Sequence, residues 1–390
     1  MTSTSGVIVL GGHVLGYGII KVYADHNIPS IVIDTEKFRI TKYSRYCKAY
    51  YTCTGDDIVD FLIRHGKEGR YNRWLVIPTD DSYLRMVSQN KQFLNEYFIV
   101  TVDNWEIIEK FYNKKYSYPL AERAGVTIPK TFYPHTENDL EHISRSIEYP
   151  CIIKPSIGHI FLKKFNKKVF VCNDWSELLE NYNNSLCIMD PGDIMVQEII
   201  PGTSEHQYSV GLFYDRDSSH NYISVRRKRQ NPPDFGTGTT YAETVEIPEL
   251  VVYAEKILRE AGFFGICEAE FKYDTRDCTF KFLEVNARIW RWHSIAEGAS
   301  VPFLLSMYKY FTTGEPVISK DYIDCAWRDD VRDIPAIYKM KRRNEFIKQE
   351  RKKTVHAVLN RQDIKPFIIQ ILSIPYFKIR SGSNKQTGYH

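Results

Sequence analysis

The sequence lacks any long hydrophobic run. No apolar stretch among its 390 residues approaches the roughly 20 residues that a membrane-spanning helix requires. The N-terminus also lacks the basic region and apolar core that mark a secretory leader. These absences favour a soluble protein of the cytoplasm.

Cysteine motifs and a strong net charge are absent too. The eight cysteines never form a Cys-x-x-Cys pair, and several lie in apolar runs typical of strands. We therefore expect reduced, buried thiols, and neither a disulfide framework nor a zinc site. Because the net charge is only +4, overall charge does not require nucleic acid, and no such partner is expected.

The N-terminal segment predicts the opening of a Rossmann-like sheet. An apolar strand at Val7–Leu10 leads into the glycine turn GGHVLGYG, a helix, and a second strand that ends at Asp34. The spacing is not a clean Gly-x-Gly-x-x-Gly, because Gly11 and Gly12 stand together. An NAD(P) site with Asp34 on a ribose hydroxyl stays open, but a domain that helps to hold a substrate is favoured.

A further strand, Trp74–Ile77, precedes Asp80 and Asp81. Ligands of open α/β sheets bind at the carboxyl ends of strands, so these aspartates are placed to touch substrate. The alternative for Asp80 is to cap the helix that follows.

Two runs predict a β-hairpin with carboxylates on one face. Gly265–Tyr273 and Thr279–Ile289 are rich in aromatic and β-branched residues, and the turn Asp274–Asp277 joins them. Since side chains alternate along a strand, the folded hairpin can bring Glu270 and Glu284 side by side.

Adjacent carboxylates repel each other unless a cation lies between them. Mg²⁺ typically takes one or two carboxylates and completes its shell with water and substrate phosphates. Glu270 and Glu284, with the amide oxygen of Asn286, therefore form a candidate metal site. Arg288, one step along the same face, is a planar cation suited to phosphate or to a developing oxyanion. The alternative is an exposed hairpin with a polar outer face.

The segment FLEVNARIWRWH, preceded by EAEF, resembles the metal-binding hairpin of the ATP-grasp superfamily, which activates carboxylates by phosphorylation. It is most similar to the carboxylate–amine ligase branch that includes D-aspartate ligase-like proteins. The resemblance implies ATP and Mg²⁺, or Mn²⁺ in its place, as cofactors, and a catalytic Arg288. It also places His293 close to the acceptor, where it would orient substrate or take a proton; a packed core histidine is the equal alternative.

The resemblance further implies a set of phosphate-binding lysines. Lys154 ends a short apolar strand, and a lysine behind buried residues needs an anionic partner such as phosphate. Lys114 matches the segment that leads into the ATP-grasp body. Lys168 is the favoured match in a loop where lysines replace most of the usual glycines, although the register across residues 163–168 leaves Lys163, Lys164 and Lys167 open. Lys228 matches a catalytic position in the basic run RRKR, which in isolation would suggest a nucleic-acid stripe.

One strand resembles the hinge that receives adenine in this superfamily. Backbone amides and carbonyls there can imitate a base pair while apolar neighbours sandwich the ring. The implied nucleotide contacts are Gln197, Glu198, Ile199, Ile200 and Glu205. A strand with an exposed glutamate would look the same.

These patterns predict an α/β protein, with α+β organisation in its body. We expect a Rossmann-like pre-ATP-grasp domain at residues 1–108 and an ATP-grasp fold at 109–320, with a mobile lid at about 131–195. A C-terminal helical extension with a flexible tail would occupy 321–390. Its charged stretch and apolar segment are read as a solvated helix and a packed segment, with contact to an anionic membrane as the alternative.

The predicted reaction is ATP- and Mg²⁺-dependent ligation of a carboxylate to an amine through an acyl phosphate, giving ADP and phosphate. The partners implied are an amino acid or other carboxylate donor and an amine acceptor, such as a peptide or cell-envelope precursor. A homodimer is common in this class. Two alternatives stay open: an NAD(P)-dependent oxidoreductase and a nucleotide-binding protein without catalysis.

Overall fold

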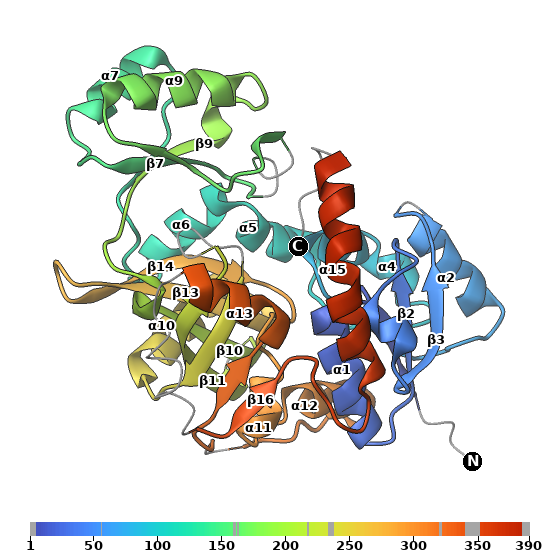
Figure 1. Ribbon diagram of the computed structural model, residues 1–390. Helices are drawn as coiled ribbons and strands as arrows, with labels where there is room; N and C mark the ends of the chain where they lie inside the picture. The colour runs from blue at the N-terminus through green and yellow to red at the C-terminus, as the bar shows by residue number, and fades with distance from the viewer. Residues whose placement is uncertain are drawn as a thin grey trace.

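A computed structural model describes most of the chain, and three sheets lie within the described part (Figure 1). The described residues are 5–55, 57–158, 161, 164–216, 218–232, 238–319, 322–339 and 352–383. The fold is mixed α/β, as predicted.

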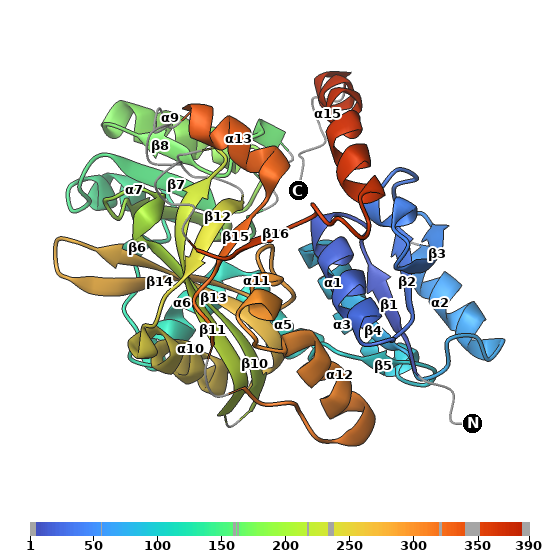
Figure 2. The ribbon, with the colours of Figure 1, turned by 60° about the horizontal axis from the view of Figure 1, so that its bottom comes forward.

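The N-terminal segment forms a five-stranded parallel sheet in the order β3-β2-β1-β4-β5. Strands β1, β2 and β4 are buried on both faces, as a parallel sheet requires. This is the predicted Rossmann-like arrangement, with helices along the sheet (Figure 2). The strands are β1 (Val7–Leu10), β2 (Ser30–Asp34), β3 (Cys47–Thr52), β4 (Leu75–Pro78) and β5 (Ile99–Val100). The helical elements are α1 (Val14–Asp25), η1 (Ile40–Tyr43), α2 (Asp57–Lys67), α3 (Asp81–Gln89) and α4 (Lys91–Leu94).

A four-stranded antiparallel sheet forms a lobe of its own, in the order β6-β9-β7-β8 (Figure 1). It packs with two helices around a small separate core that includes Leu140, Ile153 and Leu178. This lobe corresponds to the segment predicted as the lid. Its elements are β6 (Thr131–Phe132), α7 (Glu137–Ser144), β7 (Cys151–Pro155), β8 (Phe170–Cys172), α9 (Trp175–Leu186) and β9 (Ile194–Glu198). Helices α5 (Trp105–Tyr112) and α6 (Lys114–Arg123) connect it to the first sheet.

The largest sheet has seven strands in the order β14-β13-β10-β11-β12-β15-β16. Its pairs are antiparallel except for the last. The predicted hairpin is at one edge of this sheet. The strands are β10 (Gln207–Asp215), β11 (Ser218–Gln230), β12 (Thr239–Thr244), β13 (Phe264–Asp274), β14 (Thr279–Asn286), β15 (Ala326–Arg328) and β16 (Thr354–His356). The helical elements are η2 (Pro191–Asp193), η3 (Ser204–His206), α10 (Pro248–Ala261), α11 (Ile295–Gly298) and α12 (Phe303–Thr313).

Part of the region predicted as an extension completes this central sheet. Strand β15 pairs with β12, and β16 pairs with β15. Cys325, Ala326 and Trp327 are wholly buried in this arrangement, so the strand forms part of the core. Helices α13 (Asp330–Lys339) and α15 (Lys365–Ser383) belong to the same region. Most of the predicted charged helix, residues 340–351, lies outside the described residues, as does the tail from 384.

The expected buried thiols are found only in part, because Cys187 and Cys278 are exposed. All eight cysteines are free, and Cys151, Cys172, Cys267 and Cys325 are buried. Among the described residues, no helix has both the length and the apolar character needed to cross a membrane.

Candidate functional site

The hairpin of β13 and β14 pairs Glu270 directly with Glu284, as predicted. A β-bulge makes this pairing possible. Phe271 pairs with Phe282, so an unbroken ladder would set Glu270 opposite Leu283 and turn Glu284 to the other face. The extra residue, Leu283, shifts the register by one and brings the two carboxylates together.

Each carboxylate has a cation at close range. Lys114 Nζ lies 2.7 Å from Glu284 Oε2, and Arg227 Nη2 lies 2.9 Å from Glu270 Oε2. The Lys114 charge holds the pKa of the Glu284 carboxyl well below its usual range. Glu284 in turn raises the pKa of Lys114, against the effect of burial. Both groups are therefore charged at neutral pH.

Two lysines of the four-stranded lobe interact electrostatically with the same carboxylates. Lys154, at the end of β7, donates to the Tyr118 hydroxyl at 2.6 Å and stands over that ring. Burial lowers the pKa of Lys154. Burial also lowers the pKa of Lys168, while the negative charges of Glu284 and Glu270 oppose that shift. The lobe thus adds two basic residues to the hairpin face. Of the other lysines left open in 163–168, Lys163 lies outside the described residues.

The predicted hinge residues divide between two surroundings. Gln197 is buried, and its amide donates to Thr131 Oγ1 at 2.6 Å and to the Tyr118 hydroxyl at 3.2 Å. Its side chain therefore joins the group around Lys154. Ile200 is buried and Ile199 is half-buried.

Glu198 is committed to protein partners. Its carboxylate accepts from the Lys130 amide at 2.8 Å and from Arg276 Nη2 at 2.7 Å. Any contact between Glu198 and a nucleotide would therefore come from its backbone.

Lys228 does not contact the hairpin carboxylates through any described interaction; it lies at Glu205. Lys228 Nζ is 3.1 Å from Glu205 Oε2, and Arg226 Nη2 is 3.3 Å from the same oxygen. The register of β11 against β12 skips Lys228, so it is the extra residue of a bulge, which re-aims its side chain. The sequence reasoning missed Arg227 as the cation at Glu270, because a bulge in this strand leaves no signal in the run of basic residues.

Arg288 joins the hairpin to the first sheet. Its Nε donates to Asp81 Oδ1 at 2.7 Å, and its Nη2 donates to Asp81 Oδ2 at 3.3 Å and to Asn286 Oδ1 at 3.3 Å. Asp80 instead caps α3 by accepting from the Tyr83 amide at 2.8 Å, the alternative weighed for it. Burial raises the pKa of Asp80 to about 6.

Glu268 is a site residue that the sequence reasoning did not assign. It pairs with Asn286 across the hairpin and accepts from the Asn286 amide at 3.2 Å. The Trp292 indole donates to its other oxygen at 2.6 Å. The Asn286 amide also donates to Glu270 Oε1 at 3.1 Å. Burial raises the pKa of Glu268 to about 8. The available signal was its position two residues before Glu270 on the same strand face.

His293 is packed against helix α1. Its Nδ1 lies 2.8 Å from the Trp290 carbonyl oxygen, and its Nε2 is buried without a hydrogen-bond partner. A Cβ placed on Gly18 would be 2.5 Å from Nε2. Burial lowers the pKa of His293 to about 4. These contacts describe the packed core histidine that was weighed as the alternative.

The glycine turn of the first sheet is filled by its own side chains. Asp34 is 1% exposed, and its carboxylate accepts from the Gly12 amide at 2.6 Å, the Glu36 amide at 2.8 Å and Arg39 Nε at 3.2 Å. Because the Asp34 carboxylate is almost wholly buried and held by these three donors, the structure does not favour the dinucleotide alternative. Gly11 has a φ of +107°, and a Cβ there would lie 2.1 Å from Thr79 Oγ1.

The hairpin donor set fits a divalent cation of the Mg²⁺ type. The two opposed carboxylates are hard ligands that leave positions for water and phosphate. The Asn286 amide oxygen accepts from Arg288 and its NH2 group faces Glu270, so the amide would have to turn over to join them as a ligand. Among the described residues, no group of three or more histidine, cysteine, aspartate and glutamate side chains gathers as a metal site.

The chain is similar to several known proteins. Residues 241–314, which include the hairpin, match the family model for the carbamoyl-phosphate synthase L chain, ATP binding domain. A D-aspartate ligase of Enterococcus faecium is 25% identical over 300 residues, which cover 70% of this chain and 67% of that protein.

Solved structures share the fold at low identity. The biotin carboxylase domain of a Hydrogenobacter thermophilus 2-oxoglutarate carboxylase, solved with MgADP, is 17% identical with a TM-score of 0.64, covering 81% of this chain and 71% of that one. An L-amino acid ligase from Bacillus licheniformis is 15% identical with a TM-score of 0.61, covering 82% and 76%. An N5-carboxyaminoimidazole synthetase from Staphylococcus aureus is 12% identical with a TM-score of 0.63, covering 89% and 86%.

Proposed function

Because this chain belongs to the ATP-grasp superfamily of ADP-forming carboxylate–amine ligases, we propose that its hairpin face carries out the ATP-dependent step. The observation that carries the assignment is the opposed pair Glu270 and Glu284 beneath the lid lysines Lys154 and Lys168. A face of this kind concentrates cations and metal ligands where phosphate charge must be neutralised.

We assign each charged group a part in phosphoryl transfer. Glu270, Glu284 and Asn286 would hold Mg²⁺, which when bound neutralises charge on the β- and γ-phosphate oxygens. Lys114, Lys154 and Lys168 orient the phosphates and neutralise further charge. The list of implied nucleotide contacts remains part of the proposal: Gln197, Glu198, Ile199, Ile200 and Glu205.

The chemistry then proceeds in two displacements. A donor carboxylate oxygen attacks the γ-phosphorus, and the bond from that phosphorus to the β,γ-bridging oxygen breaks. ADP departs, and the donor is now an acyl phosphate. The acceptor amine attacks the acyl carbon, and phosphate departs as the amine loses a proton. Arg288, held by Asp81, would stabilise the oxyanion of the tetrahedral intermediate.

We further propose that the donor carries a second carboxylate, because two arginines approach one position near β12. A Cβ placed on Gly238 would lie 3.7 Å from both Arg291 Nε and Arg332 Nη2. Arg291 pairs with Asp329, whereas Arg332 has no side-chain ion pair within the described part of the chain. Arg291 Nε is buried without a hydrogen-bond partner. The charge of Arg291 lowers the pKa of Arg332 to about 10, so a second carboxylate on the donor would relieve this repulsion.

A substrate panel tests the reaction and the donor class together. Phosphate release with Mg²⁺ would be followed over amino acids supplied singly and in pairs, with product masses recorded. We expect release that depends on two substrates, a product of their condensed mass, and preference for acidic donors.

Arg332→Gln should raise KM for an acidic donor about 10-fold or more and leave KM for ATP unchanged, with Arg332→Lys retaining part of the affinity. Equal effects on neutral and acidic donors would remove Arg332 from donor recognition.

Further parts of the proposal concern location and assembly. The free cysteines suit the reducing cytoplasm, where ATP and Mg²⁺ are available. A peptide or cell-envelope precursor as acceptor, a homodimer, a peripheral membrane contact and the domain limits at 108 and 320 also remain proposals.

A further inference from the structure

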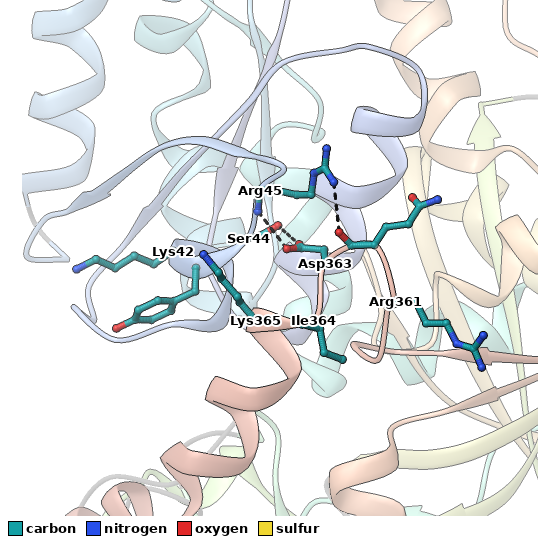
Figure 3. A pocket seen from close by; sticks show the side chains of 9 residues that line it. Lys42, Ser44, Arg45, Arg361, Asp363, Ile364 and Lys365 are labelled. Carbon is teal, nitrogen blue, oxygen red and sulfur yellow. Dashed lines mark hydrogen bonds between the residues drawn. The ribbon is translucent and has the colours of Figure 1, made fainter.

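A pocket away from the hairpin lies between η1 and the start of α15 (Figure 3). Its volume is about 510 Å³, and its two walls are more than 300 residues apart in the sequence. Asp363 is buried and pins the walls together, because it accepts from Ser44 Oγ at 2.5 Å and from the Arg45 amide at 3.2 Å. Arg45 Nη1 also donates to the Gln362 carbonyl at 3.4 Å. The pocket therefore has a defined shape.

Four cations surround this pocket: Lys42, Arg45, Arg361 and Lys365. Within the described part of the chain, none of the four has a carboxylate within ion-pair distance. The single carboxylate of the lining, Asp363, accepts hydrogen bonds from the opposite wall, from Ser44 and from the Arg45 amide. Lys365 is also the first residue of α15, where the helix dipole adds partial positive charge. Lys42 Nζ also donates to the Lys37 carbonyl at 3.3 Å and lies over the Phe38 and Tyr50 rings. The excess of positive charge along the lining favours an anion at the pocket.

An apolar stripe continues from the pocket along α15. Ile364, Ile368, Ile371 and Leu372 recur at helical spacing, so they share one side of the helix. They are 41%, 45%, 44% and 66% exposed. Phe367 and Ile369, which flank this stripe on either side of the helix, pack against the buried core. In Figure 1, α15 runs between the five-stranded sheet and the rest of the molecule.

We propose that the basic pocket and the α15 stripe together form a docking surface for an anionic phospholipid membrane. Lipid phosphates would lie against the basic lining of the pocket, and the stripe would enter the acyl boundary. Free phosphate would satisfy the charges but leave the stripe in water. A second copy of the chain would cover the stripe but bring two sets of four cations together. An anionic lipid surface satisfies both features, and the proposal does not depend on the ligase activity.

Vesicle flotation of the full-length protein tests this surface. We expect binding to phosphatidylcholine vesicles that contain phosphatidylglycerol, and much weaker binding to phosphatidylcholine alone. The double variant Arg361→Gln/Lys365→Gln should reduce the partition coefficient about 25-fold, or about fivefold for each charge removed. Ile368→Ser/Leu372→Ser should also reduce binding. Lys67→Gln and Val252→Ser, exposed on α2 and α10, are the matched controls and should bind as the parent does.

Each other outcome counts against the proposal. Equal partition onto neutral and anionic vesicles, or unchanged binding by both double variants, would overturn it. Displacement by millimolar inorganic phosphate without loss of binding in Ile368→Ser/Leu372→Ser would instead indicate a soluble phosphate ligand. A dimer in light scattering that Leu372→Ser dissociates would identify a second copy as the occupant. Circular dichroism melting curves that match the parent would show that the variants fold.

Discussion

Arg227 and Lys228 are neighbours on β11 that serve different ends of the site. Arg227 donates to Glu270, one of the proposed metal ligands, whereas Lys228 donates to Glu205. Arg227 is also tied to Gln207 at 2.6 Å and to Gln230 at 3.2 Å. The rigid fork of a guanidinium suits this bridging position better than a flexible ammonium would.

Substituting each residue separately should distinguish their roles. Arg227→Gln should lower kcat about 100-fold, because it removes a fixed positive charge beside the transferring phosphate. Lys228→Gln should act mainly on KM for ATP, because its partner Glu205 is one of the proposed nucleotide contacts. Steady-state ADP formation measures both. The opposite pattern would return the catalytic role to Lys228.

His293 provides a pH test. Its pKa falls from an unfolded value near 6.5 to about 4 in the fold, so the unfolded chain binds more protons between these values. Stability should therefore decline as pH falls from about 6.5 to 4, by at most about 3 kcal/mol from this group. Denaturant unfolding of the parent and of His293→Gln across that range should show a shallower decline in the variant.

The same variant tests whether His293 takes part in catalysis. If His293 only packs against α1, kcat for His293→Gln should stay within a few-fold of the parent at pH 7.5. A fall of 100-fold or more in soluble, folded variant would show that it acts on substrate.

Alternation along the hairpin strands predicted that Glu270 and Glu284 meet, and the structure confirms it. The reasoning did not foresee the bulge at Leu283 on which that pairing depends. Bulges insert one residue without a compositional signature, so strand parity alone can succeed or fail at them. At Lys228 a bulge had the opposite effect and displaced the expected residue.

At the scale of an element, the start of α6 sets the position of Lys114. Asn113 caps this helix through its side chain, which accepts from the Lys115 amide at 3.0 Å. The next residue, Lys114, then reaches Glu284. The cap thus links helix geometry to the charge on the hairpin face.

Removing the cap should weaken both stability and catalysis. Asn113→Ala should lower the unfolding free energy by about 1 kcal/mol. It should also lower kcat/KM for ATP, because the backbone of Lys114 is then no longer held in place by the helix cap. Asn113→Asp should restore both. Thr136→Ala removes the cap of α7 in the lid and should cost similar stability without the same loss of kcat/KM. Urea denaturation and steady-state kinetics supply the two readouts.

Helices and strands with regular patterns were predictable. For charged loops, the sequence predicted the kind of residue involved but not its position. The glycine-poor loop before β8 was expected to use lysine charge, and Lys168 does lie toward Glu284 and Glu270. Which lysine would do so depends on how the loop folds over a separate sheet. Local sequence does not contain that information.

At the scale of the molecule, two long-range links hold the site together. Arg288 at the end of the hairpin pairs with Asp81 at the start of α3, so the first sheet supports the proposed catalytic arginine. The second link is the seven-stranded sheet, whose last two strands come from beyond residue 320. Through β15 and β16, the C-terminal region of the chain becomes part of the same sheet as the hairpin.

Truncation therefore has a predicted cost. Ending the chain after residue 320 should leave it largely insoluble, because β12 loses its partner β15 and the buried Trp327 is removed from the core. Ending it after residue 383 should leave solubility and melting temperature unchanged. Soluble yield and circular dichroism compare the two. A folded, active chain ending at 320 would contradict the structural role of β15.

Chain order predicted the Rossmann-like sheet, the lid and the hairpin, because each is built from contiguous or closely spaced segments. The pairing of β15 with β12 joins segments separated by a helix-rich stretch. Nothing in the short run around Trp327 distinguishes a sheet strand from a packed loop. The sequence therefore suggested an extension where the structure completes a core.

The most direct test of the central claim is hydroxamate formation. Hydroxylamine traps an acyl phosphate, so parent protein with ATP, Mg²⁺ and an acidic amino acid should yield ADP and an amino acid hydroxamate in equal amounts. Glu284→Gln should lower that rate by about 100-fold or more while its melting curve stays like the parent's. ADP formation without hydroxamate for any carboxylate, or full activity in Glu284→Gln, would contradict carboxylate activation on this hairpin.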